Sequence, residues 1–482
     1  MIAPNAFAAR LRTERPLQVL AALVLVGAAM RIALTVQWRP AFVGYSDSGI
    51  YFQGAYQDIW ADPIRTVGYA MVLDVLHAIS PHLVLATVLQ HALGIVTGVL
   101  LYATLRRTPA PPWVALVSAA AILLGGSQIM LEHAALSEGI YTPVLVLGLY
   151  AAVRAPDGAL WWAVLAGLCA GVGVTLKGVG LVLIPVLVLC LVFAAARTSA
   201  DSLITGALAG ACAVLVLVCY IGVRQSQSDG RGLTSNGNWN LYGRVAPWAD
   251  CGKFTPPKGT EQLCDPLPVG QRHRGAEFYI FDHRSPAIRY AGPAYQLSPT
   301  PGAMDALGRF SRAAILGQPR AYLHAVWDDA ARLVDLDRPS YGQASPRQLQ
   351  GQFLHGLADG SPTGNRFVES WRVLLYPDDA THHGGVRAFT TWERWTTPRG
   401  PLMLVALLLA AASPLLAPRG ARFAASLMAS TALVLLFFPI ASKAYDYRFV
   451  IPAIGPLVAA AALAAWGLSA RLAPGSHRQG VS

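Results

Sequence analysis

The stretch 203–223, LITGALAGACAVLVLVCYIGV, contains no charged side chain. A run of about 20 apolar residues is what an α-helix needs to cross the hydrocarbon core of a bilayer. The stretch 423–442 is a second run of this kind, and 54% of the 482 residues are hydrophobic while only 13% are charged. The sequence therefore predicts a polytopic α-helical membrane protein.

Apolar runs of similar character recur along the chain and predict about ten transmembrane helices. Their expected positions are 17–36, 82–105, 113–126, 138–153, 160–176, 178–196, 203–223, 400–417, 423–441 and 449–470. The first span begins just beyond Arg10, Arg12 and Arg15, and no convincing small-residue cleavage site follows it. We therefore interpret this span as an anchor and not as a cleaved signal peptide.

Arginines gather in the short loops on one side of this arrangement, and basic loops mark the cytoplasmic side. They are Arg10, Arg12, Arg15, Arg106, Arg107, Arg154, Arg197, Arg419, Arg422, Arg471 and Arg478. Both termini are therefore expected in the cytoplasm. The formal net charge of +11 then reflects topology and not a nucleic-acid surface. Because Ala, Gly and Arg are abundant, we expect a bacterial source and a place in the cytoplasmic membrane.

A polar insertion, residues 224–398, separates an N-terminal membrane module, 1–223, from a C-terminal one, 399–482. It is punctuated by Pro and Gly, and we expect a separate extracytoplasmic domain of mixed α/β structure. Cys251 and Cys264 are the only two of six cysteines outside the predicted spans. In an oxidising compartment they are expected to form a disulfide, the alternative being two free thiols.

The segment 236–251, NGNWNLYGRVAPWADC, is aromatic and rich in turn-forming residues. Two interpretations fit this composition equally. The segment is either a surface that faces carbohydrate or an ordinary β-rich packing layer.

Asp47 lies in the sequence GYSDSGIYFQGAY, just beyond the first span in the outer loop 37–80. Tyr51, Phe52 and Ala55 follow at a spacing that predicts a helix lying in the membrane interface. A carboxylate here can act as the base for a hydroxyl acceptor, and partial burial would move its pKa toward the working pH. The alternative is a carboxylate that only caps the start of this helix.

Further ionisable or phenolic side chains lie at the same outer level. They are Glu132, His133, Glu138, Lys177, Lys443, Asp446, Tyr447 and Arg448. Such groups are costly at this depth unless they are paired or face a wet cavity, so their recurrence predicts a shared site. Arg65, Lys177 and Arg448 are suited to hold a phosphate. Taken singly, Glu138 also fits a helix cap, Arg448 a side chain that snorkels to headgroups, and Lys177 a helix end.

The order of these motifs resembles the GT-C superfamily of glycosyltransferases that use polyprenyl-phosphate sugars, and most of all its protein mannosyltransferase and aminoarabinose transferase branch. The similarity rests on the outer Asp47, on RTVGY from Arg65, on ALSEGIYTPVLVLGLY around Glu138, on VTLKGVGLVLIP around Lys177 and on YDYRFVIPAIGPL around Arg448. It covers roughly 30–195 and 440–465. Nothing as specific is found in 224–398.

The resemblance implies residue roles and a reaction. Asp47 matches the catalytic carboxylate, Lys177 and Arg448 match positions near the carrier phosphate, and Arg65, Tyr69, Glu138 and Tyr447 match cavity lining. The implied donor is a sugar on polyprenyl phosphate, transferred with inversion to an envelope glycan, lipid or protein outside the membrane. The implied enzyme is a hexosyl- or pentosyltransferase.

The sequence departs from the family pattern at Asp47, which has Ser on both sides where many relatives carry paired acids. A divalent cation is therefore neither required nor ruled out. The alternative function is a transporter or flippase of lipid-linked or anionic precursors. That class is expected to show internal repeats and helices broken near the midplane, neither of which is evident. A third reading is a noncatalytic envelope scaffold, which has no need for charges aligned at one depth.

Overall fold

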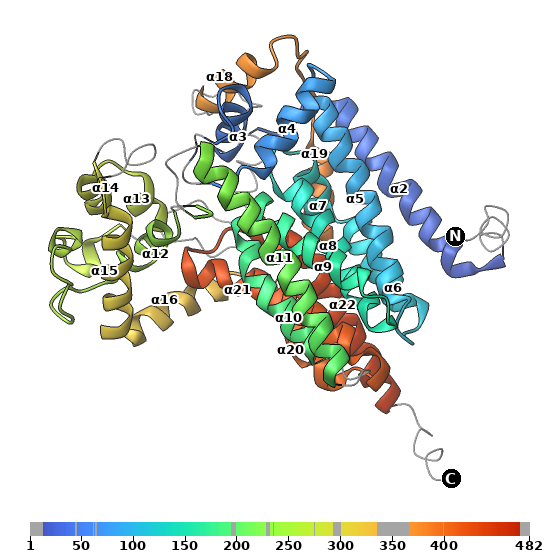
Figure 1. Cartoon of the computed structure of the whole chain (residues 1–482). Helices are drawn as coiled ribbons and strands as arrows, with labels where there is room; N and C mark the ends of the chain where they lie inside the picture. The colour runs from blue at the N-terminus through green and yellow to red at the C-terminus, as the bar shows by residue number, and fades with distance from the viewer. Residues whose placement is uncertain are drawn as a thin grey trace.

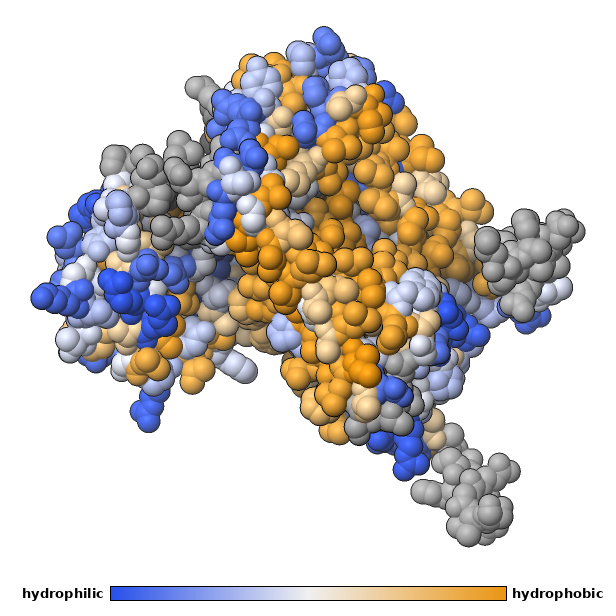
Figure 2. All heavy atoms as spheres, viewed as in Figure 1, coloured by the Kyte–Doolittle hydropathy of each residue, from blue (hydrophilic) through white to orange (hydrophobic). Residues whose placement is uncertain are grey.

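Apolar helices pack side by side in the computed structural model, and a smaller group of helices lies beside one end of this bundle (Figure 1). The model describes residues 13–43, 46–60, 62, 65–193, 199–227, 232–234, 236–273, 275–292, 300–334, 366–398 and 400–472. Apolar side chains cover much of the visible flank of the bundle, whereas hydrophilic ones gather on the smaller group (Figure 2). An apolar flank is the surface expected to face lipid.

Six described helices are long and apolar enough to cross a membrane alone. They are α2 (Arg15–Gln37), α5 (Val84–Leu105), α8 (Glu138–Arg154, continued by η1, Ala155–Asp157), α11 (Ser199–Gln227), α21 (Arg422–Ser442, preceded by η5, Arg419–Ala421) and α22 (Tyr447–Leu472). Two further pairs of helices, each bent by 48° at a short break, bring the number to eight if each pair is one span. These pairs are α6 (Pro112–Leu123) with α7 (Gly126–Glu132), and α19 (Arg387–Thr396) with α20 (Gly400–Leu416).

A helix lies at every predicted span, so the multi-pass helical fold is confirmed. The count of about ten is not confirmed, because length and composition support six spans, or up to eight with the bent pairs, within the described ranges. The difference lies in α9 (Trp161–Leu176), η2 (Gly178–Val182) and α10 (Leu183–Val192). These helices are apolar but shorter than the roughly 20 residues of an unaided crossing.

The first outer loop contains the predicted interfacial helix, α3 (Ser46–Tyr56), followed by α4 (Gly68–Ile79). The helix α18 (Arg366–Leu375) packs on α3, and α19 packs on α7. A two-stranded antiparallel ribbon joins β1 (Trp38–Arg39) to β2 (His382–His383). The end of the insertion therefore lies against the first loop.

The smaller group consists of α12 (Gly237–Val245), α13 (Ala276–Phe281), α14 (Pro286–Ala291), α15 (Ala303–Gly317), α16 (Pro319–Ala331) and the short turns η3 (Glu261–Leu263) and η4 (Val269–Gln271). Tyr242, Tyr279, Leu307 and Phe310 are buried in its own apolar core. The described part of 224–398 is thus helical apart from β2, which differs from the mixed α/β prediction. The turn-rich segment 236–251 begins as a helix, α12, because Trp239, Tyr242 and neighbouring apolar residues pack inward.

Cys251 and Cys264 form the predicted disulfide, with a Cα–Cα distance of 6.2 Å. Both side chains pack against the core of the smaller group. The bond closes the loop that follows α12 and so restrains the unfolded chain more than the folded one.

We expect Cys251→Ser to lower the free energy of unfolding of this helical group by about 3 kcal/mol, the value for a loop of this length in the chain-entropy model. Thermal unfolding of the full chain in lipid nanodiscs measures the change. Cys219→Ser is the matched control, because Cys219 is an exposed free cysteine. Equal unfolding temperatures for the two variants would contradict a stabilising disulfide.

Candidate functional site

Backbone pairing holds the start of the first outer loop against the segment that precedes α8. The Phe42 amide donates to the His133 carbonyl at 2.9 Å, and the Ala135 amide donates to the Phe42 carbonyl at 3.0 Å. The Ser48 hydroxyl then donates to the carbonyl of Ala135 at 2.9 Å. These bonds bring α3 and the beginning of α8 to the same level, although the two are far apart in sequence.

Asp47 lies in the first turn of α3, and two guanidinium groups occupy its carboxylate. Arg65 Nε and Nη2 donate to Asp47 Oδ1 at 2.8 and 2.5 Å. Arg448 Nη2 lies 2.5 Å from Asp47 Oδ2. Asp47 therefore joins the first loop to the start of α22, which is more than the helix-capping alternative requires.

Glu138 begins α8 and lies close to two cations, Lys177 and the same Arg448 that pairs with Asp47. Its Oε1 accepts from Lys177 Nζ and lies 3.6 Å from Arg448 Nε. Lys177 occupies the extended residue between α9 and η2, so the break in this apolar segment is what presents its ammonium group. Arg448 has only 10% of its side chain exposed, which argues against a residue that snorkels to headgroups.

A cavity of about 440 Å³ opens beside these groups, within the range of about 300–1,000 Å³ of small-molecule sites. Its charged lining consists of Asp47, Arg65, Lys177, Lys443 and Arg448. With four cations and one carboxylate, the lining carries a net positive charge. This cavity is suited to an anionic ligand.

The remaining predicted site residues lie behind the cavity wall or elsewhere, and none of them is among its lining residues. Asp446 Oδ2 lies 3.3 Å from Arg448 Nε, so it supports the cation as Glu138 does. The Tyr69 hydroxyl donates to Gln90 Oε1 at 2.8 Å, behind the Tyr51 ring. The Tyr447 hydroxyl donates to Glu393 Oε1 at 2.5 Å, on the side of α19.

Glu132 and His133 belong to a second, closed network in the bundle. Arg31 donates to both Glu132 oxygens, from Nε at 2.7 Å and from Nη2 at 3.0 Å. His91 Nδ1 lies 3.2 Å from Glu132 Oε2, and its Nε2 lies 3.0 Å from His133 Nδ1. All four side chains are buried, so this network joins helices, and none of the four lines the charged cavity.

The pKa of Asp47 moves in the direction opposite to the one expected from burial. Burial alone would raise it, but Arg448, Arg65 and Lys443 outweigh burial and hold the pKa well below its usual value. The carboxylate is therefore ionised, and both of its oxygens are paired with guanidinium groups. The sequence does not place Arg65 and Arg448 on Asp47, because Arg65 reaches it only through the path of the first loop and Arg448 comes from the opposite end of the chain.

Lys443 was noted at this depth but not assigned to the phosphate, and the structure places it on the cavity wall. The aromatic ring of Phe449 lies between two of the cations, 4.7 Å from Lys177 Nζ and 5.2 Å from the Arg448 guanidinium carbon. The sequence signal for both residues was their position next to Arg448 in the motif before the last span. Within the described ranges, no three His, Cys, Asp or Glu side chains converge as metal ligands.

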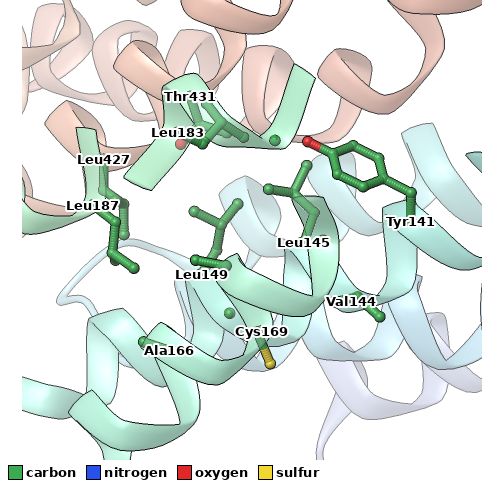
Figure 3. A pocket seen from close by; sticks show the side chains of 14 residues that line it. Tyr141, Val144, Leu145, Leu149, Ala166, Cys169, Leu183, Leu187, Leu427 and Thr431 are labelled. Atoms are coloured by element: carbon green, nitrogen blue, oxygen red, sulfur yellow. The ribbon is translucent and has the colours of Figure 1, made fainter. Parts of the chain in front are cut away.

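A second, apolar pocket lies between α8, α9, α10 and α21 (Figure 3). Leu145, Leu149, Leu183 and Leu187 surround it, and its volume is about 40 Å³. That volume is far below the roughly 300 Å³ at which ligand sites begin. We regard it as a packing gap in the bundle, and the candidate site is the charged cavity.

Residues 80–227 match the family model of dolichyl-phosphate-mannose-protein mannosyltransferases. The match runs from α5 to α11 and covers less than half of the chain. For this part of the chain it confirms the resemblance inferred from the motifs. No curated protein sequence matches the chain.

Several solved structures resemble the fold. The apo oligosaccharyltransferase of Archaeoglobus fulgidus is 13% identical, with a TM-score of 0.46 over 94% of this chain and 50% of that one. The same enzyme in complex with Zn and sulfate gives 10% identity and a TM-score of 0.44, over 93% and 51% of the two chains. The S. cerevisiae protein O-mannosyltransferase Pmt1–Pmt2 complex bound to the sugar donor is 18% identical, with a TM-score of 0.36 over 56% of this chain and 40% of that one. The chain thus spans about half the length of these structures, or less.

We expect the two charged groups to respond differently when a cation is removed. Arg31→Gln leaves the fully buried Glu132 without its bidentate partner, and loss of one partner of a buried ion pair costs about 3–5 kcal/mol. Arg65→Gln should cost less, because 18% of the Arg65 side chain is exposed and Asp47 keeps Arg448.

Thermal unfolding of both variants in nanodiscs tests this difference. A larger loss of stability for Arg65→Gln than for Arg31→Gln would contradict our assignment of Arg31 to a structural network and of Arg65 to an open site.

Proposed function

We propose that this chain is a membrane glycosyltransferase that transfers a sugar from a polyprenyl-phosphate carrier to an envelope glycan, lipid or protein. The observation that carries the proposal is the cavity in which one carboxylate and four cations meet at the outer ends of the apolar helices. A transferase acting outside the cytoplasm lacks nucleotide sugars, so its donor must be carried by a lipid. The family match over residues 80–227 supports the same class of enzyme.

The cationic wall is suited to the phosphate of the donor and still better to that of the product. A sugar phosphate diester carries one negative charge, and the departing polyprenyl phosphate gains more. Arg65, Lys177, Lys443 and Arg448 therefore stabilise the leaving group more strongly than the bound donor, which is what lowers a barrier. Glu138 pairs with Lys177 and Arg448 from behind, so both cations stay beside the cavity even when Arg448 gives up its contact with Asp47.

Asp47 becomes available when the donor phosphate competes for its guanidinium partners. As Arg65 and Arg448 turn toward the phosphate, the pKa of the carboxylate rises from its depressed value and its oxygens become free to accept a proton. The acceptor hydroxyl gives its proton to Asp47 and its oxygen bonds to the anomeric carbon. The bond from that carbon to the phosphate oxygen breaks, and the electron pair leaves with polyprenyl phosphate. Attack from the side opposite the phosphate gives inversion.

We expect Asp47→Asn to abolish release of polyprenyl phosphate from a panel of polyprenyl-phosphate sugars. The amide cannot accept the proton, so the loss should be at least the roughly 10²–10⁴-fold of a missing general base. Binding of polyprenyl phosphate itself should persist or tighten, because the cavity gains one unit of positive charge. Purified protein in nanodiscs supplies both measurements.

Asp58→Asn is the control for this variant, because Asp58 is exposed in the same loop. Full activity of Asp47→Asn would reject the base assignment. No release from any donor by the wild type, with binding also absent, would favour a transporter or a scaffold.

A second expectation concerns acid stability. Because the neighbouring cations lower the pKa of Asp47, its ion pairs stabilise the fold fully above the unfolded-state pKa of about 3.9. This contribution is lost only as the pH falls toward the lower folded-state pKa. The difference in unfolding temperature between wild type and Asp47→Asn should therefore stay constant from neutral pH to about pH 5 and shrink below that. A difference that already disappears near neutral pH would mean that the pKa of Asp47 is raised.

A further inference from the structure

The wall of the cavity that faces the cations comes from the smaller helical group. Thr234, Asn236 and Asn240 line it from the start of α12, beside Trp239 and Leu241. All of these side chains are neutral, whereas every charged group of the lining belongs to the first loop, the α9–η2 break or the region around α22. One cavity thus has a charged side and a neutral, hydrogen-bonding side.

The polar groups on the neutral side retain hydrogen-bonding capacity. Asn240 is half-buried, and its side-chain amide makes no hydrogen bond within the described part of the chain. The Thr234 hydroxyl donates to Asn236 Oδ1 at 3.0 Å, which leaves the Asn236 amino group free to donate. An amide offers both a donor and an acceptor, so it can bind hydroxyl groups in either sense.

Packing from behind makes this wall rigid. Trp239 Nε1 donates to the Ile280 carbonyl at 2.9 Å, and the Tyr242 hydroxyl donates to the Leu263 carbonyl at 2.7 Å. A Cβ on Gly243 would lie 2.6 Å from the Ile280 side chain, so α12 and α13 approach as closely as a glycine permits. The backbone of α12 is therefore held in place against α13, which fixes where its side chains begin, as a selective site requires.

A buried ion pair connects the neutral wall to the charged one. Arg244 of α12 pairs with Asp329 of α16 at 2.6 Å, and Asp329 Oδ2 also accepts the Tyr445 amide at 3.2 Å. Tyr445 lies two residues from Lys443 of the cationic wall. The carboxylate of Asp329 thus links α12 on the neutral side of the cavity to the segment that carries Lys443 on the charged side.

Apolar surface completes the neutral side. Leu241, Ile280, Phe281 and Met304 lie next to the amides in the same lining. Alternating amide and apolar surface matches a sugar ring, whose hydroxyl groups point outward and whose C–H faces are apolar. An anionic acceptor would find no cation on this side.

We propose that the α12 wall is a subsite for a sugar ring, with Asn236 and Asn240 as its specificity-determining residues. This inference rests on the proposed function, because it places the ring opposite the carrier phosphate. The sugar ring bound here can be either the sugar of the donor or a sugar unit of the acceptor, since both present the same groups.

The test uses Asn236→Ala and Asn240→Ala in the full chain in nanodiscs. Asn238→Ala is the matched control, since Asn238 lies on the same helix but packs against Gly308 of α15 and does not line the cavity. The probes are bare polyprenyl phosphate, a panel of polyprenyl-phosphate hexoses and pentoses with water as acceptor, and the same donors with methyl glycosides as acceptors.

Each cavity-facing substitution should lower kcat/KM about three- to tenfold, the effect of one hydrogen bond between uncharged groups. Binding of bare polyprenyl phosphate should not change. If the ring belongs to the donor, release to water falls as well and the ranking of the donor sugars changes. If it belongs to the acceptor, release to water is unchanged and the KM for the methyl glycoside rises.

Unchanged kinetics in both cavity-facing variants, or an equal loss in Asn238→Ala, would overturn the subsite while leaving the transferase proposal intact. A wild-type protein that neither binds polyprenyl phosphate nor releases it would instead reject the proposed function, and the subsite with it.

Discussion

The site depends on the ion pairs made by the guanidinium group of Arg448. It pairs with Asp47 from the first loop, lies close to Glu138 at the start of α8, and contacts Asp446 from its own end of the chain. Charges near the membrane surface are stable only when neutralised, so each partner fixes the position of the others. This single side chain therefore holds together the first loop, the fourth predicted span and the last span.

Two groups of charged residues differ in whether their charges are paired inside the bundle or border a cavity. Around Arg31 and Glu132 the carboxylate is met by a bidentate guanidinium and a histidine in a fully buried setting. The cavity beside Arg448 is lined by four cations and one carboxylate, while Glu138 and Asp446 pair with the cations from behind. Excess charge beside a cavity signals a ligand, whereas balanced charge inside a bundle signals a joint between helices.

Hydropathy, motif order and the position of the cysteines were enough to predict the helical membrane fold, the disulfide, and the convergence of Asp47, Arg65, Lys177 and Arg448 at one place. They could not separate Glu132 from Glu138, because both precede an apolar segment and only packing decides which one pairs with the cations of the cavity wall. The helical character of α12 was also hidden, since its Gly and Asn residues favour turns and only the core behind it stabilises a helix. The direction of the pKa shift of Asp47 was misjudged because two of the three cations that lower it, Arg448 and Lys443, come from the far end of the chain.

The pairing of Asp47 with Arg448 also has a consequence in time. During synthesis the first outer loop emerges long before the last span, so for most of translation Asp47 lacks one of its two guanidinium partners. The cationic wall is equally incomplete until Lys443 and Arg448 have been made. Nascent chains therefore carry no finished cavity, and a chain that ends before Lys443 would lack two of the four cations of the lining.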